Sequence, residues 1–371
     1  MRPIVAAVVL ISAAAAAVAV GAVPAQALSG SPPSIEVRVD TRAAREILLT
    51  LARPKWEATD ARLLEDIPAI ALSIRDSSRS NDVFERDLKA AFETESRVAV
   101  FDFRAVRDAI TRWQAFVAGI SPREPELTRM AVSQAVALLP SDAPAPAKLD
   151  VHLSFGLAGL ADNIVARAPD GGETMVIDLS RALGDSDGEP LDSRMARLAR
   201  LIAGAAFRQA WGNYRANSPA WKRPEPELGS FEPLVRIVAE GGPVALFAVD
   251  ESFLPLSTWL KGMQKKALFD LERVAMRIAE SETELEKRVE VMSELRRADF
   301  ARRVVAPAGM FMADGIRVAA GQDALKAALA SGPRAFFVAY DRATQKNKDL
   351  APLSKLIKDK LNAAAKPASK S

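Results

Sequence analysis

The chain has 371 residues, a formal net charge of +3, a single histidine and no cysteine. The lack of cysteine excludes disulfides, thiol catalysis and a lipid anchor on cysteine, and one histidine excludes any site that needs two. Residues 342–371 contain eight Lys or Arg and two Asp and carry +6, whereas residues 28–341 carry −4. The basic character therefore belongs to the C-terminal segment, which has no aromatic residues, and we expect no nucleic-acid binding.

The N-terminus has the pattern of a secretory signal peptide. Arg2 is followed by a long apolar run, and the small-x-small sequence Ala25-Gln26-Ala27 follows Pro24. The run is long enough for a membrane anchor, but its alanine-rich composition and Pro24 favour cleavage after Ala27. We predict that residues 1–27 are a Sec-type signal peptide, that the bacterial protein is periplasmic or secreted, and that no transmembrane segment remains after cleavage.

Residues 28–139 are expected to form an N-terminal helical region. From Thr41 to Leu139, apolar residues recur at spacings of three and four, which is the period of an amphipathic helix. The sequence PSDAPAPA at 140–147 then ends this pattern as a linker or an extended connection.

A small sheet is predicted to follow. In KLDVHLSF, the apolar residues Leu149, Val151, Leu153 and Phe155 alternate with polar ones, as in a half-buried strand. NIVARA and TMVIDLS are further strand candidates, and the PDGG sequence between them indicates a hairpin turn. We therefore predict a small antiparallel sheet, with His152 exposed on its polar face and without a function.

The rest of the chain is expected to be helical. DSDGE at 185–189 lacks two of the ligands of a calcium loop and is interpreted as an acidic surface loop. Apolar periodicity predicts helices near 193–215, 231–247, 256–304, 309–320 and 323–342. This order of helices, a small sheet and more helices predicts a mostly helical α+β fold, with residues 140–341 as a second region and 342–371 as a basic tail.

The helix predicted near 193–215 has the apolar pattern of a catalytic helix but lacks the side chains that such a helix uses in catalysis. Leu198, Leu201 and Ile202 form its inward stripe, and Ala205 and Gln209 are the next positions on that face. In an HExxH helix, two histidines at this i, i+4 spacing bind zinc and the glutamate after the first is the general base. The sequence AAFRQ at 205–209 has Ala205 and Gln209 at the histidine positions and Ala206 at the position of the base.

Four stretches make the chain similar to the exported bacterial zinc-dependent peptidases of the gluzincin type. VDTRAAREIL resembles the N-terminal helix entry of that family, and ARLIAGAAFRQAW resembles its HExxH helix. LVRIVAEGGPVALF at 234–247 resembles the helix that carries the third zinc ligand, which corresponds to Glu240. The stretch from Gly309 to Asp341 resembles the terminal region of the family. The resemblance covers most of residues 39–341 and implies a zincin-like helical domain.

The departures from this family suggest a peptidase scaffold without its catalyst. Both histidine positions and the general base are replaced, so the resemblance implies no zinc, no other cofactor and no catalytic residue. We call Ala205, Ala206, Arg208, Gln209 and Glu240 the vestigial site. We expect Glu240 to lie within hydrogen-bonding reach of Gln209, Arg208 or water, because a buried carboxylate needs compensation. A peptide or protein is the expected ligand of this cleft.

Three alternatives remain open at this stage. The charged segment 270–303 has an apolar seam that is typical of packing against its own domain or of a coiled-coil scaffold in the cell envelope. A further interpretation is that the protein is a hydrolase that uses carboxylates alone, although the sequence shows no convincing acid pair. LSKLIKDKL near the C-terminus is expected either to be solvated and frayed or to touch an anionic surface weakly as an amphipathic helix.

Overall fold

The computed structural model confirms a mostly helical α+β fold with one small sheet. It describes residues 35–363 except 94–98, 143–145, 157–161, 168–170, 185–187, 249–257, 296 and 298–303. The predicted signal peptide therefore lies outside the described residues. None of the helices within these described ranges is long and apolar enough to cross a membrane.

The sheet is mixed, so the prediction of an antiparallel sheet was wrong for most of its pairs. Its strands are β1 (Ile35–Asp40), β2 (Ala147–Ser154), β3 (Asn163–Arg167) and β4 (Glu173–Asp178), in the order β1-β2-β4-β3. Only β3 and β4 are antiparallel, as the hairpin signal predicted, whereas β2 is parallel to β1 and to β4. A turn motif fixes the pairing of the two strands that it joins, and it carries no information about partners that are distant in sequence.

Strand β1 was not predicted, although Ile35, Val37 and Val39 alternate with polar residues as a strand requires. It lies at the edge of the sheet beside β2, with Val37 opposite Leu149. The predicted inward face of β2 is confirmed, since Leu149, Val151 and Leu153 are fully buried.

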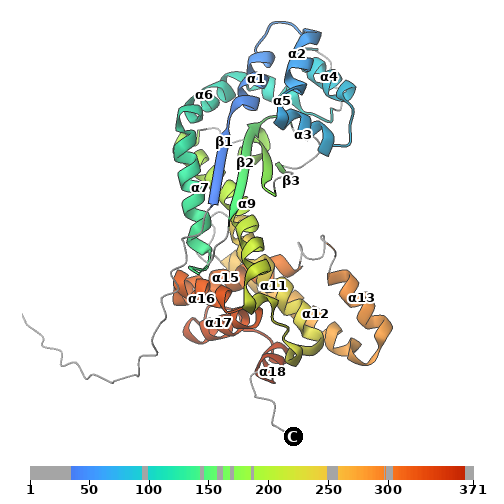
Figure 1. The fold of residues 1–371 in the computed structure, drawn as a ribbon, viewed down its shortest axis with the longest axis vertical. Helices are drawn as coiled ribbons and strands as arrows, with labels where there is room; N and C mark the ends of the chain where they lie inside the picture. The colour runs from blue at the N-terminus through green and yellow to red at the C-terminus, as the bar shows by residue number, and fades with distance from the viewer. Residues whose placement is uncertain are drawn as a thin grey trace, which may run out of the picture.

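The sheet-bearing half of the molecule contains the first seven helices. Helix α7 packs beside β1 and along α9, and α1 packs on β2 (Figure 1). These helices are α1 (Arg42–Leu51), α2 (Ala58–Glu65), α3 (Pro68–Asp76), α4 (Asn81–Ala90), α5 (Phe103–Asp108), α6 (Ile110–Ile120) and α7 (Glu124–Leu138).

Helix α9 (Leu191–Asn217) runs from the sheet to a second group of helices, which forms the lower half of Figure 1. Within that group, α11 packs against α15 and α17. Besides the short α8 (Leu179–Leu183) and α10 (Pro219–Lys222), the remaining helices are α11 (Glu232–Ala245), α12 (Thr258–Glu280), α13 (Leu285–Leu295), α15 (Ala306–Ala320), α16 (Gln322–Ala330), α17 (Pro333–Lys346) and α18 (Lys355–Ala363).

Two of the long helices expected from periodicity are divided. The stretch predicted as 256–304 breaks after Glu280, where the short 3-10 turn Ser281–Thr283 separates α12 from α13. The stretch predicted as 323–342 breaks at Gly332, whose positive φ of 97° precedes Pro333 at the start of α17. Apolar periodicity continues through both breaks, so it could not locate them.

The apolar seam predicted in 270–303 is only partly buried. Leu271, Val274 and Ile278 on α12 are buried, whereas Val289 on α13 is 61% exposed. The α12 part of the seam therefore packs on its own domain, and the seam does not continue as one buried stripe.

The C-terminal segment is packed as far as Ala363, which corrects the expectation of a solvated, frayed tail from residue 342. Helix α18 contacts α12, and the side chains of Ile357 and Leu361 are 3% and 4% exposed. Two of its lysines form ion pairs, Lys358 with Asp341 on α17 and Lys360 with Glu282 in the 3-10 turn after α12, the latter at 2.9 Å. The amphipathic pattern of this helix thus serves internal packing, and contact with an anionic surface stays a prediction.

Candidate functional site

Helix α9 carries the five positions that match the HExxH template. It begins after Pro190 and ends before Ser218-Pro219, where the missing N–H of the proline and its steric demand stop a helix. Ala205 and Ala206 are 6% and 0% exposed, so both lie in the packed interior. Neither side chain contains a donor atom that could bind a metal or accept a proton.

The polar members of the AAFRQ stretch point to the sheet. Arg208 forms an ion pair with Glu173 at the start of β4, with Nη2 and Oε2 3.0 Å apart. Gln209 is 9% exposed, and its Nε2 donates to the carbonyl of Gly171 at 3.4 Å. Its Oε1 is buried and has no hydrogen-bond partner among the described residues. Both side chains thus contact the segment that leads into β4.

Glu240 lies on α11 and faces a different turn of α9. Its Oε1 is 2.6 Å from Nη1 of Arg215, and the side chains of the pair are 30% and 26% exposed. The indole Nε1 of Trp211 donates to the backbone carbonyl of Glu240 at 3.0 Å. Trp211 and Arg215 are four residues apart and share one side of α9, so this side is the one that meets α11.

The expectation that Arg208 or Gln209 compensates Glu240 was therefore wrong about the partner. The hydrogen bonds of Arg208 and Gln209 go to Glu173 and Gly171, and the cation beside Glu240 is Arg215. The carboxylate is compensated, as its partial burial requires.

Arg215 is held in position by aromatic rings as well as by Glu240. Its guanidinium carbon lies 5.7 Å from the ring centroid of Trp211 and 5.8 Å from that of Trp221. The two indoles pack edge to face with centroids 4.9 Å apart. The pattern of the HExxH template gave no signal for this cluster, because none of its three side chains occupies a template position.

These residues do not fit a zinc ion. The described part of the chain contains no group of three or more His, Cys, Asp or Glu side chains that could hold a metal. At the vestigial site, Glu240 is the only residue with a preferred zinc ligand atom, and its carboxylate already has an arginine partner. An arginine beside the carboxylate opposes the binding of a second cation there.

His152 is not an exposed residue, contrary to the prediction. Its side chain is 19% exposed, and its Nδ1 lies 3.3 Å from Oδ2 of Asp40. Strand β1, which the sequence analysis missed, places Asp40 directly beside His152 in the parallel register. The pair alone does not form a catalytic triad, since the structure shows no nucleophile hydrogen-bonded to the imidazole among the described residues.

Comparison with known families identifies a matching family. The sequence profile of a family described as "Putative zinc dependent peptidase (DUF5700)" matches residues 67–349. No curated protein and no solved structure shows significant similarity to the chain. The matched range contains the sheet strands β2–β4, α9 and α11, and thus all five residues of the vestigial site. The chain therefore belongs to this metallopeptidase-like family.

Proposed function

We propose that this protein is an exported, catalytically inactive relative of the zinc peptidases, which binds a peptide rather than cleaving it. The observation that supports the proposal is that Ala205, Ala206 and Gln209 on α9 stand where the HExxH pattern has its metal-binding and basic groups, with Glu240 paired to Arg215. Loss of the zinc ion removes both the Lewis acid and the nucleophile that a metallopeptidase needs. We place the protein in the periplasm or outside the cell on the basis of residues 1–27.

An extended peptide is the ligand that the sheet supports best. Strand β3 is the last strand of the sheet, and its outer edge is unpaired within the described residues. Such an edge offers a row of backbone donors and acceptors to an added strand. Its partner strand β4 begins at Glu173, which contacts Arg208 of the vestigial site, and Gly171 shortly before it accepts from Gln209.

The catalytic part of the proposal is tested with the purified chain after removal of residues 1–27. A single carboxylate ligand holds zinc weakly, so we expect less than about 0.1 zinc ion per chain after dialysis. We also expect no cleavage of casein. Stoichiometric zinc, or cleavage that a chelator abolishes, would overturn it.

The assignment of positions 205 and 209 is tested by restoring two ligands. The variant Ala205→His/Gln209→His would restore the two histidines of the template on α9, and adding Arg215→Gln would free the carboxylate of Glu240. We expect zinc affinity to rise at least about tenfold on adding Arg215→Gln, since an uncompensated carboxylate is the better ligand. Arg208→Gln in the same background is the control, because Arg208 pairs with Glu173 and should leave zinc affinity unchanged. A folded double variant that binds no zinc with or without Arg215 would contradict the assignment.

Peptide binding is tested with a fluorescently labelled, unfolded fragment of casein. We expect saturable binding by fluorescence anisotropy, and at least tenfold weaker binding of the same peptide methylated on alternate backbone nitrogens. N-methylation removes the donors that pair with a strand edge and leaves the side chains unchanged. Equal affinity of the two peptides would refute pairing at the edge of β3.

A second candidate function is supported by exposed apolar residues on α12. Phe269 and Met276 are 58% and 47% exposed, and their spacing of seven residues places them on one side of this helix. This surface favours a scaffolding role through contact with another protein. Analytical ultracentrifugation of Phe269→Ser/Met276→Ser beside the native chain tests whether it mediates self-association.

A further inference from the structure

A groove of about 780 Å³ runs along one face of the hairpin that α16 and α17 form. The end of α15 and the segment 220–227 complete its walls. Its lining consists mainly of alanine, from Ala324 on α16 to Ala343 on α17, and several of these alanines are partly exposed. On α17 the lining extends from Arg334 to Lys346, which at a rise of 1.5 Å per residue gives a length of about 18 Å. An open groove of this length between two helices fits a third helix.

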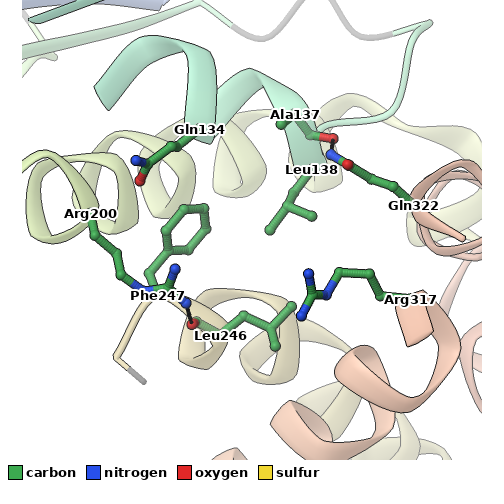
Figure 2. A pocket seen from close by; sticks show the side chains of 8 residues that line it. All are labelled: Gln134, Ala137, Leu138, Arg200, Leu246, Phe247, Arg317 and Gln322. Atoms are coloured by element: carbon green, nitrogen blue, oxygen red, sulfur yellow. Dashed lines mark hydrogen bonds between the residues drawn. The ribbon is translucent and has the colours of Figure 1, made fainter. Parts of the chain in front are cut away.

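Contacts on their other sides hold the two helices of this hairpin in place. At the start of α16, Gln322 donates from Nε2 to the carbonyl of Ala137 on α7 (Figure 2). On α17, the rings of Phe336, Phe337 and Tyr340 are at most 1% exposed, so they anchor this helix in the core. The groove is therefore preformed, and a partner helix would not have to pay for its rearrangement.

One end of the groove carries a net positive charge. Arg342 and Lys346 line it one helical turn apart, both are exposed, and neither side chain has a hydrogen bond or an ion pair with another described residue. The neighbouring Asp341 does not compensate them, because it pairs with Lys358 at 2.8 Å. Two like charges four residues apart on a helix repel each other. An acidic partner would relieve this repulsion.

The two acidic residues that line the groove, Glu225 and Glu227, lie at its other end. They belong to the segment that meets the start of α17, since a Cβ added at Gly332 would lie 2.9 Å from the carbonyl oxygen of Ala220. Two arginines line this end as well, so it has no net charge. These arginines are Arg223 and Arg334. The charge of the groove is therefore complementary to a helix whose acidic residues lie at the end of α17.

Helix α13 presents such a face. Glu286 and Glu290 are exposed and four residues apart, and neither has a hydrogen bond or an ion pair with another described residue. Val289 lies on the same side of the helix and is 61% exposed. The nearby Glu294 is already paired, with Arg277 at 2.7 Å. The exposed face of α13 thus has two unpaired carboxylates around one apolar side chain.

We propose that α13 of one copy of this protein docks in the groove between α16 and α17 of a second copy. In Figure 1, α13 and the α16–α17 hairpin lie at opposite sides of the lower half, so α13 cannot reach the groove of its own chain. The 11 residues of α13 span about 16 Å, which the groove accommodates. Because two different surfaces meet, the copies assemble head to tail, as an open chain or a ring.

The charges also set the direction of the docked helix. When α13 runs antiparallel to α17, Glu286 lies beside Lys346 and Glu290 beside Arg342. Val289 then faces the alanines of the groove, and the rest of α13 continues along it. In the parallel direction, the same two ion pairs would carry most of α13 beyond the end of α17.

Sedimentation equilibrium of the purified chain without residues 1–27 tests the proposal. We expect the weight-average mass to rise above that of the monomer as the concentration is raised to about 1 mM. The association should weaken at least about fivefold between about 0.05 M and about 0.5 M NaCl, because salt screens exposed ion pairs. A chain that stays monomeric throughout this range, or an association that salt leaves unchanged, would overturn the proposal.

Charge reversal on each surface identifies the contact. Arg342→Glu/Lys346→Glu and Glu286→Lys/Glu290→Lys should each weaken self-association at least about tenfold, because like charges then face each other. An equimolar mixture of the two variants should associate as the native chain does, since each surface again meets one of opposite charge. A mixture that stays monomeric would refute the pairing of these surfaces.

Two controls separate this contact from other causes of self-association. Lys348→Glu/Lys355→Glu makes the same change in net charge with residues that do not line the groove, so it should associate as the native chain does. Phe269→Ser/Met276→Ser should also associate normally, and a loss of association there would assign the contact to α12 instead. If a charge-reversed chain does not fold, Glu286→Gln/Glu290→Gln takes its place: weaker association is expected, and native association would contradict the proposal.

Discussion

The placement of Glu240 depends on a close approach between α11 and α15 that a single methyl group should disrupt. The two helices meet at Gly242 and Gly309, and a Cβ added at Gly242 would lie 2.7 Å from Cα of Gly309 and closer still to its carbonyl group. These are backbone atoms, which cannot rotate away as a flexible side chain could. Gly242→Ala therefore requires the helices to move apart.

The adjacent residue provides a matched control. Gly241 lies on the same helix, and a Cβ there would meet nothing within 4 Å. Replacing glycine by alanine in a helix stabilises it by about 1 kcal/mol, and this gain applies to both variants. Overpacking costs about 1–3 kcal/mol and applies to Gly242 alone, with the upper end expected for a contact between backbones. We expect Gly241→Ala to gain about 0.5–1 kcal/mol and Gly242→Ala to lose about 1–2 kcal/mol.

The free energy of unfolding is measured by urea titration, with circular dichroism at the helical minimum as the signal. A difference of about 1.5–3 kcal/mol between the two variants is the expected result. If Gly242→Ala is as stable as Gly241→Ala, then α11 and α15 do not approach each other through these glycines. The position of Glu240 against α9 would then need revision.

Three further outcomes follow from the packing and charges. In a double-mutant cycle, Arg215→Gln and Glu240→Gln should show a coupling of about 0.5–1 kcal/mol, the value for a partly exposed ion pair, and a coupling of zero would refute the pair. Burial raises the pKa of Glu225, so its ionisation destabilises the fold as pH rises through and above the ordinary carboxyl pKa. In urea titrations, the free energy of unfolding of Glu225→Gln should accordingly exceed that of the native chain by more at pH 7 than at pH 4. An equal difference at the two pH values would contradict this. Ile357→Ala should lower the free energy of unfolding by about 2 kcal/mol, because the Ile357 side chain on α18 is buried, whereas a solvated tail would show no change.

Local patterns in the sequence predicted the class of the fold and several of its faces. The alternation in β2 identified Leu149, Val151 and Leu153 as buried, and the glycine-containing turn identified the antiparallel pair β3 and β4. Both signals depend only on residues that are close in the chain. The parallel pairs of β2 with β1 and β4 depend on long connections, and no local pattern specifies them.

The partner of Glu240 could not be predicted for a related reason. The template led us to examine Arg208 and Gln209, which lie within the HExxH-like stretch. Glu240 instead meets α9 about one to two turns beyond Arg208, at Trp211 and Arg215, and this position along the helix is set by the packing of whole helices. The proximity of Trp221 to both residues also requires the chain to turn back at Ser218-Pro219.

Under the proposed function, the loss of the zinc-binding groups and the presence of Arg215 are physically linked. In a zinc peptidase the metal compensates the charge of the third ligand, and a carboxylate left at this position without the metal would be partly buried and unpaired. Arg215 supplies the missing positive charge, and the rings of Trp211 and Trp221 hold its guanidinium in place. The same arginine would oppose a metal ion if the histidines were restored one at a time. The proposed function therefore predicts that recovery of zinc binding requires changes at both the ligand positions and Arg215.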